Sequence, residues 1–329
     1  MKITAHLFYN GKYRKGTVHI ERDRIIDFNE ENINPEYVLT EGFVNAHTHI
    51  GDSFIKEVPR TGIKELVGPG GFKQRMLESA DDKMILKGMR ESIRLMQRED
   101  IRAFFDFRES GIKGLNIIKR ALNDGMEGVI LTRPSGPVYD EKEIEYLLEN
   151  SSGIGLSSIS DYDPDFISKV ARKTKEKGRI FSIHASERIR EDIDFILDLK
   201  PDFLVHMHRA TDDDLRKVSR AGIPVVVAPR SALFFGTFVD FSRFIRNDVR
   251  IALGTDNAML AVPSIRMEMN LSYYLGLDPV EALKAGTIAM DRFLRKEKSL
   301  LLFRAGPGEI VKNPYLRPVK RLNISDGII

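Results

Sequence analysis

The sequence predicts an α/β fold: a (β/α)8 TIM-type barrel with a small β-sandwich domain formed from the N- and C-terminal segments. Three observations favour this fold. The chain has 329 residues, which suits one such barrel with additions. Through its middle, short apolar runs alternate with amphipathic stretches, as repeated βα units do. Both ends have the alternating apolar and polar pattern that is typical of strands.

The small β domain is expected to comprise residues 1–38 and 306–329. Its N-terminal part alternates apolar and polar positions around Asn10–Gly11, a common turn sequence of β-hairpins. His6 and His19 lie within this pattern and are interpreted as half-exposed strand residues. The C-terminal part has the same pattern, broken by Pro and Gly, so the two ends are expected to pair into one domain.

The barrel is expected over residues 39–305, with eight parallel strands. Each candidate strand is a short apolar run followed by an amphipathic stretch. These runs are residues 39–46, 101–107, 128–132, 153–160, 179–184, 202–207, 223–229 and 250–256. Periodicity does not show whether a sheet closes, so an open doubly wound sheet is the alternative.

Helices are predicted where apolar residues recur at helical spacing and capping residues mark the ends. The clearest helices are residues 81–99, 163–178 and 211–222. In the last of these, Thr211 is a suitable N-cap before an acidic first turn, and Gly222 is a suitable stop.

One connection differs from the others. Residues 51–80 contain several Gly and Pro and are predicted to form a loop of about thirty residues, a length that usually indicates a functional or disordered segment. Because it follows the first strand, this loop is expected on the face that carries the active site. The sequence does not decide whether it acts as a lid.

Composition narrows the class of protein. Charged residues make up 30% of the chain, and there is no Cys and no Trp, which favours a heat-adapted cytoplasmic protein without disulfides. The N-terminus lacks the apolar stretch of a signal peptide. The net charge of +3 is small for this length, so neither a nucleic acid nor a membrane is expected as a partner. The expected partner is a small-molecule substrate, and a homo-oligomer stays open.

The histidines indicate a metal site. His47 and His49, in "GFVNAHTHIGDS", follow the first barrel strand and face the same side of an extended segment, so they can share one ion. His184, His206 and Asp256 fall at the ends of the fifth, sixth and eighth strands. Because barrel active sites form where strands end, these side chains are expected to converge on one mouth. Such a His and carboxylate set suits Zn²⁺ or a similar divalent ion with an open position for water.

The alternative is that these histidines are structural, as a single His at a strand end usually is. His208 is interpreted in this way, as a residue that supports the site or the following loop. Five of the seven histidines lie at strand ends, which favours a shared site over five separate structural roles.

On these motifs the chain resembles the amidohydrolase superfamily of metal-dependent hydrolases. "GFVNAHTHIGDS" is similar to its first-strand His-x-His motif, "IHASE" to its fifth-strand His-x-x-Glu, "LVHMH" to its sixth-strand His and "LGTDN" to its eighth-strand Asp. The resemblance covers almost the whole chain and is strongest to the cytosine deaminase, guanine deaminase and chlorohydrolase branch. It implies one divalent ion, Zn²⁺ or Fe²⁺, with proton handling by Glu187 and His206 and metal ligands His47, His49, His184 and Asp256.

Two features bear on the branch. Two-metal members carry a bridging Lys, Glu or Cys in the fourth strand, and "GIGLSSIS" has none, which favours a single metal. The branch often has Asn-Pro-x-Ser-Asn after the seventh strand, whereas this chain has "APRSAL", with Ala228 and Ala232 at the Asn positions. The sixth-strand segment is also one residue shorter than the usual His-Cys-Val-His. These departures concern the substrate more than the metal.

The expected chemistry follows from these roles. A divalent ion can lower the pKa of water towards neutrality and so supply hydroxide as a nucleophile. Asp256 is expected to accept the proton that leaves this water, and Glu187 to protonate a ring nitrogen and then the leaving ammonia. His206 would hydrogen-bond the hydroxide or polarise the tetrahedral centre. The alternative for Glu187 is a surface acid paired with Arg188 or Arg190.

Three arginines, Arg108, Arg133 and Arg230, follow candidate strands and are therefore expected on the catalytic face as substrate-binding residues. At least one, Arg133 above all, is predicted to bind a carboxylate or phosphate of the substrate. The alternative is that they pair with the nearby acids Asp106, Glu109, Asp161 and Asp163.

The sequence thus favours a metal-dependent hydrolase acting on C–N bonds other than peptide bonds, in particular a hydrolytic deaminase of an amino-substituted purine, pyrimidine or related heterocycle. A cyclic amidohydrolase or chlorohydrolase-type enzyme is one alternative, and a non-catalytic metal-binding barrel is another. The absence of Cys excludes the Cys-ligated zinc deaminases. No Walker A, His-Glu-x-x-His or EF-hand sequence occurs.

Overall fold

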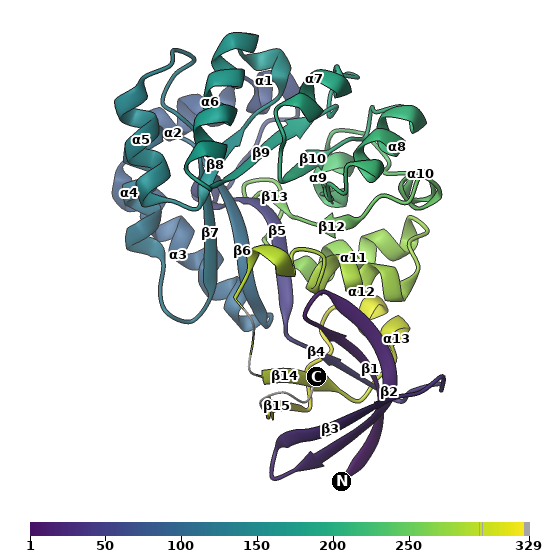
Figure 1. Cartoon of the computed structure of the whole chain (residues 1–329). Helices are drawn as coiled ribbons and strands as arrows, with labels where there is room; N and C mark the ends of the chain where they lie inside the picture. The colour runs from purple at the N-terminus through teal and green to yellow at the C-terminus, as the bar shows by residue number, and fades with distance from the viewer. Residues whose placement is uncertain (296, 298, 326–329) are drawn as a thin grey trace.

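The computed structural model describes residues 1–325 except 296 and 298. Most of the chain surrounds one curved sheet of parallel strands (Figure 1). Its strands, in the order of the chain, are β5 (Phe43–His49), β6 (Ile101–Arg108), β7 (Glu127–Thr132), β8 (Gly153–Leu156), β9 (Ile180–Ala185), β10 (Phe203–His206), β11 (Val225–Val227), β12 (Ile251–Leu253) and β13 (Asp256–Asn257). The predicted α/β architecture is confirmed, and all eight predicted runs contribute a strand to this sheet.

The two edges of the sheet meet in one short segment of the chain. β12 pairs with β11, and β13, which follows it directly, pairs with β5. Between them the amide of Gly254 donates to Val227 O (3.0 Å) and that of Thr255 to His47 O (2.9 Å). A Cβ on Gly254 would lie 2.6 Å from the Cβ of His47, so only glycine permits this approach.

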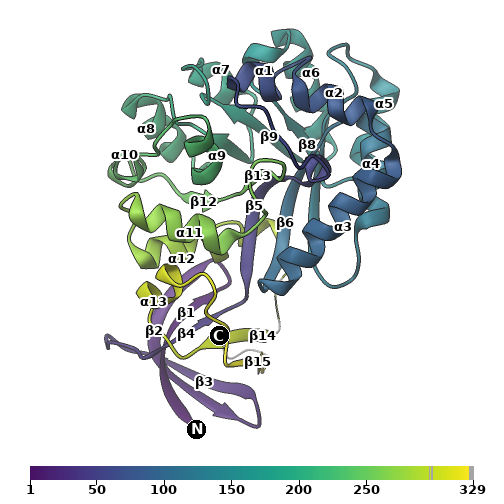
Figure 2. The same cartoon turned by 180° about the vertical axis from the view of Figure 1, so that it is seen from behind.

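Helices cover the outer face of this sheet (Figures 1 and 2). The predicted helices are present with ends one or two residues inside the expected ones, and Thr211 forms a capping box with Asp214. None of the described helices has the length and apolar character needed to cross a membrane. The helices from residue 82 onwards are α3 (Asp82–Arg98), α4 (Gly111–Ala121), α5 (Glu141–Asn150), α6 (Pro164–Glu176), α7 (Ile193–Asp198), α8 (Asp212–Arg220), α9 (Pro229–Phe234), α10 (Phe241–Arg246), α11 (Ile265–Tyr274), α12 (Pro279–Thr287) and α13 (Pro307–Lys312), with the short 3₁₀ turns η2 (Ile159–Asp161) and η3 (Asp291–Phe293).

The segment predicted as a long loop is ordered. It contains η1 (Ile50–Asp52), α1 (Ile63–Val67) and α2 (Phe72–Ser79). Ile55 and Leu66 are buried together with Met259, which lies just after β13. The segment therefore packs over the end of the sheet where β5 and β13 stop.

Strands from both ends of the chain form a second sheet, which lies below the first in Figure 1. This sheet is a closed barrel, so the predicted β-sandwich is wrong in detail: β1 pairs with both β2 and β4, and β14 with both β4 and β15, which leaves no free edge among the described strands. β14 belongs to this sheet although its sequence lies before residue 306, and residues 326–329 lie outside the described residues. The strands are β1 (Lys2–Tyr9), β2 (Lys12–Glu21), β3 (Arg24–Glu30), β4 (Tyr37–Thr40), β14 (Ser299–Phe303) and β15 (Lys320–Ile324).

A buried cluster of charges joins the two sheets. Nη2 of Arg102, in β6, contacts the carboxylates of Glu41 (3.3 Å) and Asp291, and all three side chains are at most 9% exposed. Asp291 also accepts a hydrogen bond from the amide of Gly11, in the first hairpin turn (2.7 Å). Burial, with Asp291 nearby, raises the pKa of Glu41 to about 8.

Replacing Arg102 by Met should lower the free energy of unfolding by about 3–5 kcal/mol, because it removes the cation from two buried acids. Urea denaturation followed by circular dichroism measures this change. Arg216→Met is the matched control, since Arg216 forms an exposed pair with Asp213, and its effect should stay within about 0.5 kcal/mol. Equal effects of the two substitutions would contradict the assigned role of Arg102.

Candidate metal centre and active site

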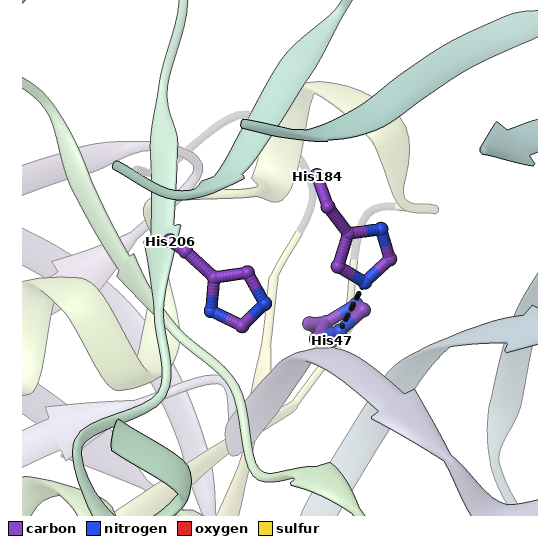
Figure 3. Close-up of side chains that lie close together, drawn as sticks. All are labelled: His47, His184 and His206. Carbon is purple, nitrogen blue, oxygen red and sulfur yellow. Dashed lines mark hydrogen bonds between the residues drawn. The ribbon is translucent and has the colours of Figure 1, made fainter. Parts of the chain in front are cut away.

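Four donor atoms from three strand ends lie close together. Nε2 of His47 is 3.2 Å from Nε2 of His184 and 3.3 Å from Oδ1 of Asp256. Nε2 of His49 is 3.5 Å from the same Asp256 oxygen. Figure 3 shows the rings of His47 and His184 pointing at one another, with His206 beside them. The structure therefore places His47, His49, His184 and Asp256, here called the donor cluster, next to one another. His206 also lies within reach of a shared ion, both with His47 and His184 and with Glu187 and Asp256.

Hydrogen bonds hold two of these rings with Nε2 free to bind a metal. Nδ1 of His184 lies 2.7 Å from Leu156 O, and Nδ1 of His49 lies 3.0 Å from Phe107 O. A carbonyl oxygen only accepts, so Nδ1 carries the hydrogen and Nε2 keeps its lone pair. Burial lowers the pKa of His47, of His184 and of His49, the last to about 3, so these rings are neutral at pH 7.

The residues fit a divalent metal ion. Donor atoms that bind one ion at about 2.0–2.2 Å lie about 3–3.5 Å from one another, which agrees with the separations seen here. Nε2 of His47 and Nε2 of His184 are 3.2 Å apart, so a proton or a cation must lie between them. Three imidazoles and one carboxylate form the donor set of a catalytic ion such as Zn²⁺ or Fe²⁺.

Hydrogen bonds hold the carboxylate of Asp256 in its ionised form. Its Oδ2 accepts a hydrogen bond from Ser231 Oγ (2.6 Å), and its Oδ1 accepts one from Asn257 Nδ2 (2.9 Å). Burial alone would raise the pKa of Asp256, but its interactions with the neighbouring histidines, the hydrogen bond with His47 first among them, hold the pKa well below its usual value. Asp256 and His206 have positive φ angles, 61° and 77°, a strained conformation that occurs preferentially at functional sites.

Glu187 and His206 lie side by side at the edge of the donor cluster. Oε1 of Glu187 is 3.5 Å from Nε2 of His206, and both residues line the same cavity. Burial, followed by the charge of Asp256, raises the pKa of Glu187 to about 8, so this carboxyl group carries a proton at pH 7. Within the described part of the chain Glu187 forms no ion pair with an arginine: Arg188 pairs with Asp161 (3.0 Å) and Arg190 with Asp214 (2.8 Å).

A buried carboxylate fixes the turn that carries Glu187. Glu191 accepts hydrogen bonds from the amide of Ser186 (2.8 Å), from the amide of Ser160 (3.1 Å) and from the hydroxyl of Ser158. Sequence reasoning did not single out Glu191. The spacing of Glu191 from His184 offered no signal, since two of the three bonds come from the loop after β8, which is distant in the sequence.

Lys73 was also missed. It lies on α2, is 5% exposed, and its ammonium donates to Glu109 Oε1 (2.7 Å) and Asn257 Oδ1 (3.0 Å). The same Glu109 oxygen is 2.7 Å from Nδ1 of His49. Lys73 thus connects the segment over the site to both His49 and Asp256, through one intermediate residue each. In the sequence it looks like any other lysine of an amphipathic stretch.

The three arginines have different surroundings. Arg108 is buried, pairs with Glu109 and lies 3.6 Å from Asp106, and Arg230 pairs with Glu268 (2.6 Å). Among the described residues, no acidic side chain pairs with Arg133, and Arg133 alone of the three lines the cavity beside the donor cluster. Arg108 and Arg230 are thus engaged within the protein, whereas the guanidinium of Arg133 is available.

His208 stands apart from the donor cluster. Its ring centroid is 5.4 Å from that of His206, and neither of its ring nitrogens has a hydrogen-bond partner among the described residues, although both are buried. Burial lowers the pKa of His208 from 6.5 to about 3.

This depressed pKa predicts a pH effect on stability. Between pH 7 and pH 5 the unfolded chain takes up a proton on His208, whereas the folded chain does not. This proton stabilises the unfolded state, so the free energy of unfolding decreases as the pH falls below 6.5. The variant His208→Phe does not take up this proton. Its free energy of unfolding minus that of the unsubstituted protein should therefore be about 1–2 kcal/mol larger at pH 5 than at pH 7. Urea denaturation of both metal-free proteins at the two pH values measures it. A difference independent of pH would show that His208 titrates normally.

Two adjoining cavities open at this end of the sheet. The one beside the donor cluster has a volume of about 60 Å³. The second, of about 630 Å³, extends between α2, the start of α4 and the segment after β7. They share the lining residues Val67, Gly68, Lys73, Arg133, Ser157 and Asp161.

The curved parallel sheet, with a His and Asp cluster at its strand ends, is an arrangement that could hold a metal ion. Residues 38–299 match the Amidohydrolase family, and the chain belongs to this family. A protein of Archaeoglobus fulgidus that is named as an aminohydrolase is 33% identical to this chain, over 91% of this chain and 88% of its own length. An uncharacterized protein of Methanocaldococcus jannaschii is 34% identical over 97% of this chain and 90% of its own length.

A solved structure shows the same fold. A zinc-bound adenosine deaminase from Xanthomonas campestris superimposes with a TM-score of 0.73 at 14% identity, covering 96% of this chain and 89% of that protein. The curved parallel sheet is thus of the TIM-type barrel kind found in this family, whose members typically bind a divalent metal.

Proposed function

We propose that this protein is a hydrolytic deaminase of an amino-substituted heterocycle, a purine, pyrimidine or related ring, and that it uses one divalent ion, Zn²⁺ or Fe²⁺. The observation that carries the proposal is the convergence of His47, His49, His184 and Asp256 beside Glu187, a carboxyl group whose pKa is raised by burial. The relative assigned as an aminohydrolase supports the same reaction type.

The ion would be held by the three imidazoles and the Asp256 carboxylate. When bound, it supplies a Lewis acid and lowers the pKa of water towards neutrality. Leu156 O and Phe107 O fix the tautomers of His184 and His49, and Ser231 and Asn257 orient Asp256. A single site is proposed because β8 offers no Lys, Glu or Cys as a bridging ligand.

The remaining residues handle protons. Deamination joins a water oxygen to the ring carbon that carries the amino group and then breaks the carbon–nitrogen bond, so protons must reach a ring nitrogen and the departing ammonia. Glu187 carries a proton at neutral pH and lines the cavity, so it can deliver the first of these and, once recharged from water, the second. His206, 3.5 Å from Glu187, can donate a hydrogen bond to the oxygen that is added, and Asp256 can accept the proton that water loses.

The proposed function is tested by measuring ammonia release from a panel of amino-purines, amino-pyrimidines and amino-triazines. The purified protein is assayed after loading with Zn²⁺ or Fe²⁺, and the chelated protein is the control. We expect ammonia from at least one ring and none after chelation. Ring opening of a cyclic amide or release of chloride, with no ammonia from any amino-heterocycle, would instead support one of the other hydrolase activities.

A further inference from the structure

The charge of Arg133 is not balanced by the protein. The backbone of Arg133 is fixed, because its amide donates to Arg108 O (2.8 Å) and its carbonyl accepts from the amide of Gly111 (3.1 Å). Its Nε is buried and has no hydrogen-bond partner among the described residues. Arg133 is only partly buried and lines both cavities, so the rest of its guanidinium can meet a ligand there, and an acceptor that bound Nε would also satisfy its buried donor.

The neighbouring charges are already paired. Asp161, which lines the same cavities, binds Arg188 at 3.0 Å, and Glu109 binds Lys73 at 2.7 Å. Each of these acids therefore has a cation of its own, and the charge of Arg133 stays available to a ligand. Arg108 and Arg230 are engaged with buried acids, so the same argument does not extend to them.

The sizes of the cavities place a substrate against Arg133. The cavity at the donor cluster, about 60 Å³, is smaller than the roughly 150 Å³ cavity that accommodates benzene in another protein. A heterocycle at the metal centre must therefore extend into the adjoining cavity of about 630 Å³. Arg133 belongs to the wall that the two cavities share, so an extended substrate passes it.

The larger cavity has room for a substituent much larger than an amino group. Ser110 and Ser135 also line it, and the side chain of Ser110 makes no capping hydrogen bond to α4. The hydroxyl of Ser110 and the guanidinium of Arg133 are donors on the same wall. A planar or tetrahedral oxyanion accepts from such donors, and a guanidinium binds it through two parallel hydrogen bonds.

We infer that the substrate is an amino-heterocycle with an oxyanion substituent, a carboxylate or a phosphate, and that Arg133 binds this substituent in the larger cavity. This inference rests on the proposed deaminase function for the reaction at the ring. The binding of the anionic substituent is a separate property and is measured separately.

The first measurement is kinetic. Each amino-heterocycle of the panel is supplied in three forms: neutral, with a carboxylate and with a phosphate on its substituent. We expect an anionic form to have the higher kcat/KM, and Arg133→Met to lower kcat/KM for that form by about 10- to 100-fold, mainly through KM. For the neutral form, kcat/KM should change less than about threefold in Arg133→Met. For the anionic form, Arg133→Lys should retain part of the kcat/KM that Arg133→Met loses. Arg216→Met, which removes an exposed guanidinium on α8, is the matched control.

The second measurement is binding without turnover. Calorimetry gives the affinity of the zinc-loaded protein for the oxo-heterocycles that deamination would produce, again in neutral, carboxylate and phosphate forms. We expect an anionic form to bind at least about tenfold more tightly than the neutral form, and this preference to disappear in Arg133→Met. The carboxylate and phosphate forms distinguish the two kinds of oxyanion.

The outcomes separate the two proposals. Ammonia release that is highest with neutral forms, or an equal loss with neutral and anionic forms in Arg133→Met, would overturn the role of Arg133 and leave the deaminase proposal intact. Absence of ammonia release from every compound would overturn the deaminase proposal, and the binding data would then decide the role of Arg133. Equal affinity for the neutral and anionic forms, or binding of neither form, would overturn the role of Arg133.

Discussion

Glu187→Gln is expected to lower kcat by about two to four orders of magnitude while the protein keeps its ion. The substitution preserves the size and the hydrogen-bonding capacity of the side chain but removes the titratable proton. Glu187 is not among the four proposed ligands, and its pKa of about 8 makes it the acid of this cavity. Steady-state ammonia release and metal content by mass spectrometry, on the same preparation, measure both parts of the prediction.

Glu176→Gln is the matched control for this experiment. Glu176 lies on α6, its side chain is 59% exposed, and it faces Arg172 across one helical turn. This variant should keep the kcat of the unsubstituted protein. Near-normal turnover by Glu187→Gln would remove Glu187 from the mechanism, and loss of the ion would show that it acts as a ligand instead.

His47→Ala is expected to weaken metal binding by more than about a hundredfold and to abolish turnover. His47 is fully buried, and its Nε2 lies within 3.3 Å of both His184 Nε2 and Asp256 Oδ1, so its removal opens the centre of the donor cluster. Competition with a chromophoric chelator gives the dissociation constant and the number of ions per chain. Asp256→Ala should behave in the same way.

His19→Ala provides the matched control, because His19 lies on β2 of the closed β-barrel, a different sheet from the one that carries the donor cluster. It should bind one ion with unchanged affinity. Two tightly bound ions per chain would contradict the single-metal assignment. Unchanged affinity in His47→Ala would show that the ion is held elsewhere.

Much of the fold could be predicted because its signals are local. Thr211 with its acidic first turn marked the start of α8, and the apolar runs marked the strands. The meeting of the two edges of the parallel sheet depends instead on contacts between distant segments, such as the close approach of Gly254 to His47. For the same reason the closed β-barrel of the two ends was predicted as a sandwich: closure depends on β1 and β14 each pairing on both sides, which no single strand sequence reveals.

The donor cluster was predictable for a related reason. Its histidines lie at the C-terminal ends of β5 and β9, Asp256 follows β12, and parallel strands of one sheet bring their ends to one place. Lys73, Glu109 and Glu191 support the site from helices and turns, so their position depends on how the chain returns after a strand. Among the arginines, the sequence placed all three near the mouth, but only the structure distinguishes the paired Arg108 and Arg230 from Arg133.

The most direct test of the metal centre is an anomalous diffraction map, recorded at the zinc absorption edge, from crystals of the zinc-loaded protein. The account predicts one strong peak bounded by Nε2 of His47, His49 and His184 and by Oδ1 of Asp256. A fully occupied zinc peak elsewhere in the molecule, or no peak among these four atoms, would contradict it.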